Sequence, residues 1–280
     1  MTLHPWKLWD PETGASAAVV PELQALLAAS LERTGDHPGL CHLWIHLLEM
    51  SPTPELALPV CDRLRALSPD NPHLCHMPSH IDVLVGHYTD AIAANAKAIE
   101  ADRKLVENNQ IGTFFAGYAA HDYHMLVFAA MYAGQYAAAK DAALAMVEAH
   151  ASDALLKSLP PPLVNFQEGF VGVVLHVYIR FGRWDEIADY AMPEDKELYA
   201  ATVATLHYAR AIMHGVKGEL SAARAEQQEF ERARASPCMA ERVIHNNGLP
   251  AIMAVAAESE CCKNHFSALD KSRFPCQIVF

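Results

Sequence analysis

The stretch Pro72-His-Leu-Cys-His-Met-Pro-Ser-His-Ile-Asp-Val83 carries histidines at positions 73, 76 and 80. Thirty-four residues earlier the chain reads Cys41-His-Leu-Trp-Ile-His46, so His42 and His46 align with His76 and His80. A spacing of four residues places both imidazoles of a pair on one face of a helix. Two histidines that are four residues apart on one helix can also chelate a single metal ion. The repeated pair therefore predicts repeated helices that each present a histidine face.

A period of 34 residues is typical of tetratricopeptide repeat (TPR) units, which are helix-turn-helix units stacked into a solenoid. A recurring turn supports this, since Gly86-His-Tyr88 precedes Ala91 and Gly134-Gln-Tyr136 precedes Ala139, with weaker copies at Gly182 and Gly218. We predict an all-α, TPR-like α-solenoid of antiparallel helix pairs with a histidine-lined concave groove. It forms a single domain over residues 1–260, with repeats at about 38–71, 72–107, 120–151, 168–197 and 204–237, followed by a C-terminal tail at 261–280.

Hydrophobic periodicity and turn residues predict where the helices lie. We expect helices at about 22–33, 39–50, 55–67, 74–85 and 89–107, and a last helical segment at about 240–258. The two long repeat steps require insertions, one at 108–117 and one at 152–167. Long loops inside a compact domain are often functional, so we expect both insertions to cover the histidine groove.

Composition excludes several classes of function. The chain has 280 residues, 52% of them hydrophobic, and a net charge of −12. This charge argues against a nucleic-acid partner or an anionic membrane surface. No apolar run reaches the roughly 18 residues of a membrane helix, and the first residues lack the apolar core of a secretory signal. We therefore expect a cytoplasmic protein whose seven cysteines are reduced and mostly buried.

Half of the sixteen histidines align on the positions that face the groove of a TPR solenoid. These positions are the second, fifth and ninth of each repeat's first helix, as the family's architecture implies. The residues are His42, His46, His73, His76, His80, His121, His124 and His176. Neighbouring helices lie about 8–10 Å apart, so imidazoles from successive repeats can converge on one or two metal ions.

The residue types limit the choice of metal. Imidazole suits copper, iron, zinc and nickel, whereas a groove with few carboxylates disfavours calcium, magnesium and manganese. We favour copper, with iron or zinc as the alternatives. Glu49, Asp82 and Asp122 are candidates for orienting the ligands from behind. Glu168, at the groove edge, is the candidate catalytic residue, either as a ligand or as a general base.

Several segments resemble a histidine-rich, bacterial-type group of TPR proteins. They are His4-Pro-Trp-Lys-Leu-Trp9, His42 to His46 followed by Ser51-Pro-Thr-Pro-Glu55, and His73 to Ile81, in this order. The resemblance covers about residues 4–150 and implies that relatives carry further repeats before the Trp-rich segment, so we expect a shortened chain. His121-Asp-Tyr-His124 departs from the pattern of that group, and the resemblance supplies no activity.

The predicted function is a metal-dependent enzyme that oxidises a small molecule with oxygen, using one or two histidine-ligated ions in the groove. The first alternative within enzymes is metal-dependent hydrolysis with Glu168 as the base. A TPR module that binds a peptide partner in the same groove is the alternative from another class. Metal storage or delivery is a third, although it usually employs thiol- or methionine-rich ligands rather than nearly pure imidazole.

Overall fold

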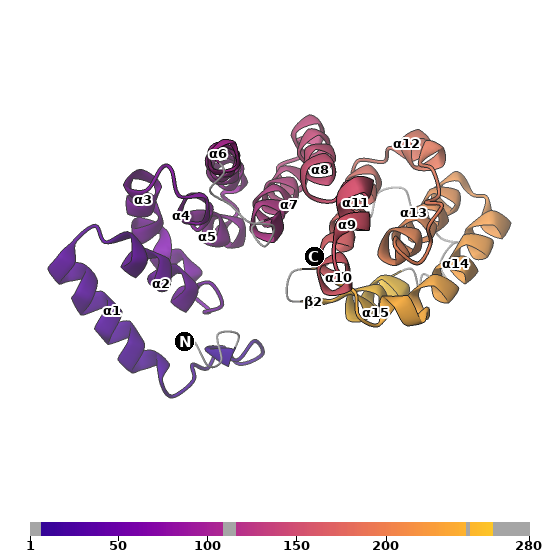
Figure 1. Cartoon of the computed structure of the whole chain (residues 1–280). Helices are drawn as coiled ribbons and strands as arrows, with labels where there is room; N and C mark the ends of the chain where they lie inside the picture. The colour runs from indigo at the N-terminus through magenta and orange to yellow at the C-terminus, as the bar shows by residue number, and fades with distance from the viewer. Residues whose placement is uncertain (1–6, 109–115, 245–246, 260–280) are drawn as a thin grey trace. The chain divides into compact units, whose positions relative to one another are not determined.

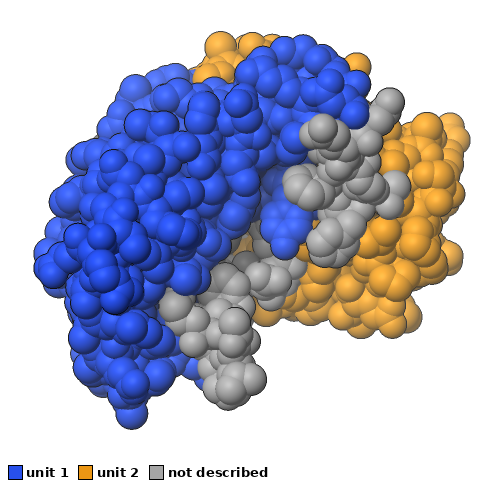
Figure 2. Space-filling view, turned by 60° about the vertical axis from the view of Figure 1, so that its left-hand side comes forward, with its two compact units in different colours: residues 1–135 blue, residues 136–280 orange. Residues whose placement is uncertain are grey.

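The computed structural model describes residues 7–108, 116–244 and 247–259, and these fold into helices joined by short turns (Figure 1). The strands assigned among them are Val243–Ile244 (β1) and Asn247–Gly248 (β2), which pair antiparallel. The prediction of an all-α protein is thereby confirmed. The chain divides into two compact units, residues 1–135 (unit 1) and 136–280 (unit 2), which Figure 2 draws in blue and orange.

Unit 1 is a succession of helices that pack mainly against helices one or two places away along the chain, with α6 covering both α4 and α5. The helices are α1 (Val20–Thr34), α2 (Pro38–Leu48), the 3-10 turn η2 (Pro54–Ala57), α3 (Leu58–Leu67), α4 (Pro72–His76), α5 (Pro78–Val85), α6 (Tyr88–Glu107) and α7 (Ala116–Tyr132). Helices α2, α4, α5 and α7 carry seven of the eight histidines singled out in the sequence.

Helix α2 separates its apolar residues from its histidines. Cys41, Ile45 and Leu48 are buried in the core of unit 1 together with residues of α3 and α5. Residues at i and i+4 share a helical face, so His42 and His46 lie together beside this apolar stripe. The burial of the stripe against α3 and α5 therefore fixes the direction in which the two imidazoles point.

The histidine segment 72–85 is two helices rather than one. Asn71 caps the start of α4 by accepting a hydrogen bond from the Leu74 backbone N–H at 3.1 Å. Pro78 has no N–H and cannot continue the hydrogen-bond ladder of α4, so α5 begins anew at this residue. Gly86 then ends α5 with a left-handed φ of 83°. The break lies between His76 and His80 and sets the angle between their helices.

Unit 2 contains the remaining described helices. They are α8 (Tyr136–His150), α9 (Asp153–Ser158), α10 (Pro161–Gln167), the 3-10 turn η4 (Glu168–Phe170), α11 (Val173–Arg180), α12 (Trp184–Asp189), α13 (Ala200–Lys217), α14 (Leu220–Arg234), the 3-10 turn η5 (Pro237–Met239) and α15 (Leu249–Ser259). The longest of them, α13, packs closely against α14.

The predicted repeat turns share one backbone conformation. Gly86, Gly134, Gly182 and Gly218 all have positive φ, between 62° and 83°, a conformation that glycine adopts without steric cost. In each case a helix begins two residues later, at the start of α6, α8, α12 and α14. The small or branched residue three positions into that helix is buried every time, at Ala91, Ala139, Ile187 and Ala223. The same local turn therefore recurs four times.

Some segments differ from the sequence-based expectation. The expected insertion at 152–167 forms the short helices α9 and α10, which are separated by Leu159 and Pro160 in extended conformation. The last expected helical segment instead contains β1 and β2 before α15. Most of the other insertion, residues 109–115, and the tail 260–280 lie outside the described residues. Among the described helices, none combines the length and apolarity that a bilayer-spanning segment requires.

A buried ion pair joins α3 to α5 in unit 1. The Arg65 guanidinium donates to both carboxylate oxygens of Asp82, at 2.6 and 2.8 Å, and the Asp82 side chain is fully buried. Asp82 was a candidate for orienting a metal ligand, and the structure instead pairs it with Arg65. Removing one partner of a buried ion pair leaves an uncompensated charge in the interior.

We predict that Arg65→Ala lowers the free energy of unfolding of unit 1 by on the order of 3 kcal/mol, the lower end of the range for buried pairs, because Arg65 is partly exposed. Urea denaturation followed by circular dichroism measures this change. Arg63→Ala, on the same helix, is the matched control and should have a much smaller effect. Equal destabilisation by the two substitutions would contradict the importance of the ion pair.

Candidate metal centre

Four helices of unit 1 supply a cluster of imidazoles. Helix α2 provides two of them, α4 another two, and α5 and α7 one each. The side chains form two groups of three, His42, His46 and His73 (triad one), and His76, His80 and His121 (triad two). Within each triad, one ligand atom from each residue lies within 4.8 Å of the others. Each triad can therefore hold one metal ion.

Triad one joins α2 to α4. The His42 and His73 Nε2 atoms lie 3.1 Å apart, and the His42 ring centroid is 4.6 Å from that of His46. Burial, followed by the charges of neighbouring imidazoles, lowers the pKa of His42 and of His73 to about 4. Both rings are therefore neutral at pH 7 and offer a lone pair, the form in which imidazole binds metals.

Triad two joins α4, α5 and α7. The His76 and His80 Nε2 atoms lie 2.8 Å apart, and the ring centroids of His76 and His121 lie 4.6 Å apart. His76 is fully buried, whereas His80 and His121 are partly exposed. The second site thus has one ligand in the interior and two toward its open side.

The two triads adjoin each other. The ring centroids of His46 and His80 are 5.7 Å apart, and those of His73 and His76 are 6.3 Å apart. These separations between triads fall within the 4.6–6.4 Å range of the contacts between rings inside the triads. The six imidazoles therefore form one continuous cluster rather than two distant sites.

Glu49, which follows α2, orients one ligand of each triad. Its Oε1 lies 2.7 Å from His46 Nδ1, and its Oε2 lies 2.6 Å from His80 Nδ1. Burial alone would raise the pKa of Glu49, but the hydrogen bonds and charges of His46 and His80 outweigh it and lower the pKa to about 2. The carboxylate is therefore ionised and accepts a hydrogen bond from each Nδ1.

His76 is oriented from behind by an amide and a carboxylate. Its Nδ1 lies 2.7 Å from Asn95 Oδ1 and 3.2 Å from Asp122 Oδ1. The Asn95 amide nitrogen donates to the Ala91 carbonyl at 2.8 Å, so the amide oxygen is the atom that faces His76. Burial, together with the charge of nearby Asp102, raises the pKa of Asp122 well above its usual value. Outer partners of this kind fix the tautomer of a ligating histidine.

These contacts determine which nitrogen of each ring faces the triads. A neutral imidazole carries one N–H, and the Nδ1 atoms of His46, His76 and His80 all face acceptors. In the neutral form of these rings, the Nε2 atoms carry the lone pairs. In triad two, the Nε2 atoms of His76 and His80 lie within hydrogen-bonding distance, at 2.8 Å. With both rings neutral and protonated on Nδ1, their lone pairs face each other, and a cation bound between them would relieve the repulsion.

The spacing of the nitrogens suits a transition metal. Bonds of about 2.0–2.1 Å, as in zinc–imidazole sites, place adjacent ligating nitrogens roughly 3 Å apart. The observed Nε2 separations of 3.1 Å in triad one and 2.8 Å in triad two fit this geometry. Three protein ligands are the number found in catalytic sites that leave a coordination position open.

Two of the predicted ligands lie outside the triads. His124 is on α7, one turn after His121, and is buried, but it belongs to neither group of three found among the described residues. His176 lies on α11 in unit 2 and is partly buried, and desolvation of its ring lowers its pKa to about 4. The structure therefore brings six of the eight predicted histidines together within unit 1.

Asn95 is the functional residue that the sequence reasoning missed. It lies on the buried face of α6, between Ala91 and Ala98, and is itself fully buried. A polar residue in a row of buried alanines needs a hydrogen-bond partner, and that position was the available signal. The partner, His76, lies on a different helix, so sequence spacing did not reveal it.

Glu168, the predicted catalytic residue, is buried in unit 2 beside the start of α13. Its Oε1 accepts hydrogen bonds from the Thr202 backbone N–H at 2.8 Å and hydroxyl at 2.7 Å. Its Oε2 accepts from the Ala201 N–H at 3.1 Å and lies 3.3 Å from Arg242 Nε. The carboxylate thus satisfies unpaired N–H groups of the first helical turn, and this role accounts for its burial without catalysis.

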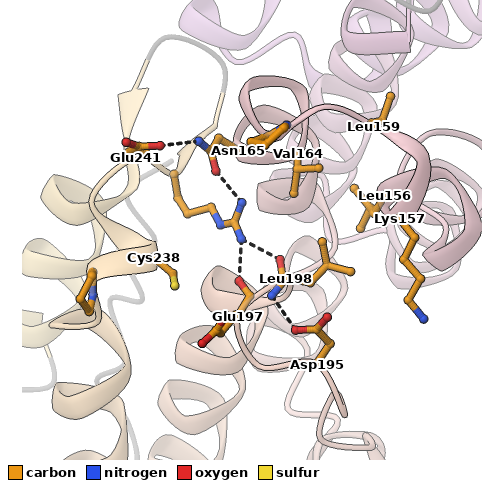
Figure 3. Close-up of a pocket in the computed structure, with 13 residues that line it drawn as sticks. Leu156, Lys157, Leu159, Val164, Asn165, Asp195, Glu197, Leu198, Cys238 and Glu241 are labelled. Atoms are coloured by element: carbon orange, nitrogen blue, oxygen red, sulfur yellow. Dashed lines mark hydrogen bonds between the residues drawn. The ribbon is translucent and has the colours of Figure 1, made fainter.

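Arg242 links the same network to a pocket of about 530 Å³ in unit 2 (Figure 3). Its guanidinium donates to Asn165 Oδ1 at 2.7 Å and to the backbone carbonyls of Glu197 and Leu198 at 2.7 and 2.8 Å. Because these acceptors belong to the protein itself, the buried arginine ties α10 to the segment before α13. The pocket wall is therefore built by structural contacts.

Comparison with known proteins returns no matching family model and no matching curated protein.

We predict that Glu168→Gln destabilises unit 2 without changing the metal content of unit 1. The substitution removes the charge that compensates buried Arg242, at a cost on the order of 3 kcal/mol. Thermal unfolding and elemental analysis measure the two effects. Glu197→Gln is the control, because Glu197 meets Arg242 through its backbone carbonyl. A stable Glu168→Gln variant that retains its metal but loses activity would support the general-base role instead.

Proposed function

We propose that unit 1 binds two transition-metal ions, one in each histidine triad, and uses them to oxidise a small molecule with oxygen. The observation that carries the proposal is the convergence of Nε2 atoms whose Nδ1 atoms already face acceptors. A histidine in a helical core ordinarily hydrogen-bonds to a local partner. Six imidazoles turned toward one another across four helices are better explained by ligation.

The ligand set favours copper, with iron or zinc as alternatives. All six donors are imidazoles, which suit these metals, and copper(II) binds nitrogen sites more tightly than the other divalent ions of its row. Neutral ligands leave the charge of the ion uncompensated, and they therefore favour the lower oxidation state more than carboxylates would. A site that must gain and return electrons benefits from such a ligand set.

The protein's own groups would hold the ions and control access to them. Redox-active ions bound here would supply electron transfer between substrate and oxygen. Glu49 and Asn95 keep the ligating rings in the required tautomer and orientation. Buried His76 closes the interior side of the cluster, while the partly exposed members of both triads lie toward solvent. A substrate is therefore expected to approach from the side of these exposed rings.

Hydrolysis fits the same residues less well. A metal-dependent hydrolase needs a general base close to the metal-bound water. The carboxylates in contact with the triads, Glu49 and Asp122, face the Nδ1 atoms of ligands, and Glu168 caps α13 in unit 2. Each of them already has a structural role.

A TPR-type solenoid is part of the proposal. It is supported by the four left-handed glycine turns and by the buried residue that follows each of them. In this arrangement the histidine-bearing helices are the first helices of successive repeats, which explains why their imidazoles share one surface.

We predict that the wild-type protein, expressed without a histidine tag in metal-replete medium, contains two copper ions per chain. His42→Ala/His73→Ala and His76→Ala/His121→Ala should each retain one ion, because each removes two ligands of a single triad. Elemental analysis by mass spectrometry gives the stoichiometry. His214→Ala, outside the cluster, is the control and should retain two. A metal-free wild-type protein would refute the proposed function.

We also predict that the copper-loaded protein consumes oxygen in the presence of a small reducing substrate. A panel of phenols, aromatic amines and ascorbate, followed with an oxygen electrode, tests this. The zinc-loaded protein should be inactive because zinc does not change its oxidation state. Oxygen uptake that is equal for the copper-loaded and zinc-loaded forms, or ester hydrolysis by the zinc form alone, would count against oxidation.

A further inference from the structure

Glu49 lies outside the triads and contacts a ligand of each of them. Its two oxygens lie 2.7 Å from His46 Nδ1 in triad one and 2.6 Å from His80 Nδ1 in triad two. By contrast, the amide of Asn95 contacts His76 alone among the six ligands. The carboxylate is mostly buried, with its side chain 11% exposed, and its position at the end of α2 places it between the triads.

We propose that Glu49 is the positioning residue that allows both triads to hold an ion at the same time. The inference rests on the proposed function, since it concerns the same two metal sites. One carboxylate can accept from two Nδ1–H groups because both of its oxygens are acceptors. It thereby directs the Nε2 lone pairs of His46 and His80 toward their separate ions.

The negative charge of Glu49 also favours the binding of two ions at the same time. Two cations bound in adjoining triads repel each other, and six neutral imidazoles do nothing to offset this repulsion. A carboxylate bonded to one ligand of each ion attracts both cations. The low exposure of Glu49 strengthens this attraction because buried charges are screened less by solvent.

An amide at position 49 would satisfy only one triad. Glutamine has one oxygen that accepts and one NH₂ group that only donates. The histidine facing the NH₂ group must present an Nδ1 lone pair, which moves its proton to Nε2 and blocks ligation. Glu49→Gln should therefore prevent either His46 or His80 from acting as a ligand, but not both.

The test is a titration of metal-free protein with copper against a competing chelator. The wild-type chain should bind two ions. In Glu49→Gln the first ion should bind tightly, while the affinity for the second falls about 10- to 100-fold, the usual effect of losing an outer partner of a ligating histidine. Asn95→Ala, the matched control, should lower the affinity for the ion in triad two alone, and Asn95→Asp should restore that affinity.

Variants that keep only one triad distinguish a Glu49 that serves both triads from a Glu49 that only stabilises the fold. In a His80→Ala background, His46 is the remaining partner of position 49, so the amide oxygen can accept from it. Adding Glu49→Gln there should lower the affinity of triad one much less than it lowers the affinity for the second ion in the full chain, because the hydrogen bond to His46 is kept and only the charge is lost. The same substitution in a His46→Ala background should likewise have only a small effect on triad two. A loss of affinity in both single-triad backgrounds equal to the loss in the full chain would overturn the inference.

A second measurement does not depend on the variants. In metal-free wild-type protein, ¹⁵N chemical shifts of the imidazoles report the tautomers of His46 and His80, and both should carry the proton on Nδ1. An Nε2–H tautomer at either residue would also overturn the inference. If the wild type binds no metal, the proposed function fails; if Glu49→Gln binds two ions with wild-type affinity, only the role of Glu49 fails.

Discussion

The close approach of His76 Nε2 and His80 Nε2, at 2.8 Å, is the constraint on which the account of unit 1 depends. Both rings have their Nδ1 atoms directed at acceptors, Asn95 for one and Glu49 for the other. In the proposed metal-binding state both rings are neutral, and imidazoles held in this way present their lone pairs to the same point. A cation bound there would be attracted by both rings, and the hydrogen bonds behind the rings would hold them in position for it.

The fold produces this arrangement through ordinary helix packing. The apolar stripe of α2 is buried against α3 and α5, which turns His42 and His46 toward α4. Pro78 interrupts the helical segment between His76 and His80, and Asn95 reaches His76 from the buried face of α6. Each contact crosses between helices, so the cluster depends on the assembled unit rather than on any one helix.

Much of the fold and part of the site could be predicted from the sequence. Periodic leucines and alanines with glycine and proline boundaries located the helices of unit 1 to within a few residues, because these signals are local. The repeated histidine pairs and the alignment of the repeats selected eight histidines, and the six residues that cluster are among them. Roles that depend on interhelical angles could not be predicted: that Glu49 reaches both His46 and His80, that Asp82 pairs with Arg65, and that Glu168 caps α13. His124 and His176 align with the other histidines in the repeats but lie outside both triads, and this too depends on helix packing that the alignment does not describe.

X-ray absorption spectroscopy of the metal bound by the purified, untagged protein tests the central claim most directly. Two ions held by the histidine triads should give a first shell of nitrogen at about 2.0–2.1 Å, the distance of imidazole ligation, the outer-shell scattering of imidazole rings, and a further contribution from the second metal ion. A first shell dominated by sulfur or carboxylate oxygen, or one without imidazole scattering, would contradict the claim.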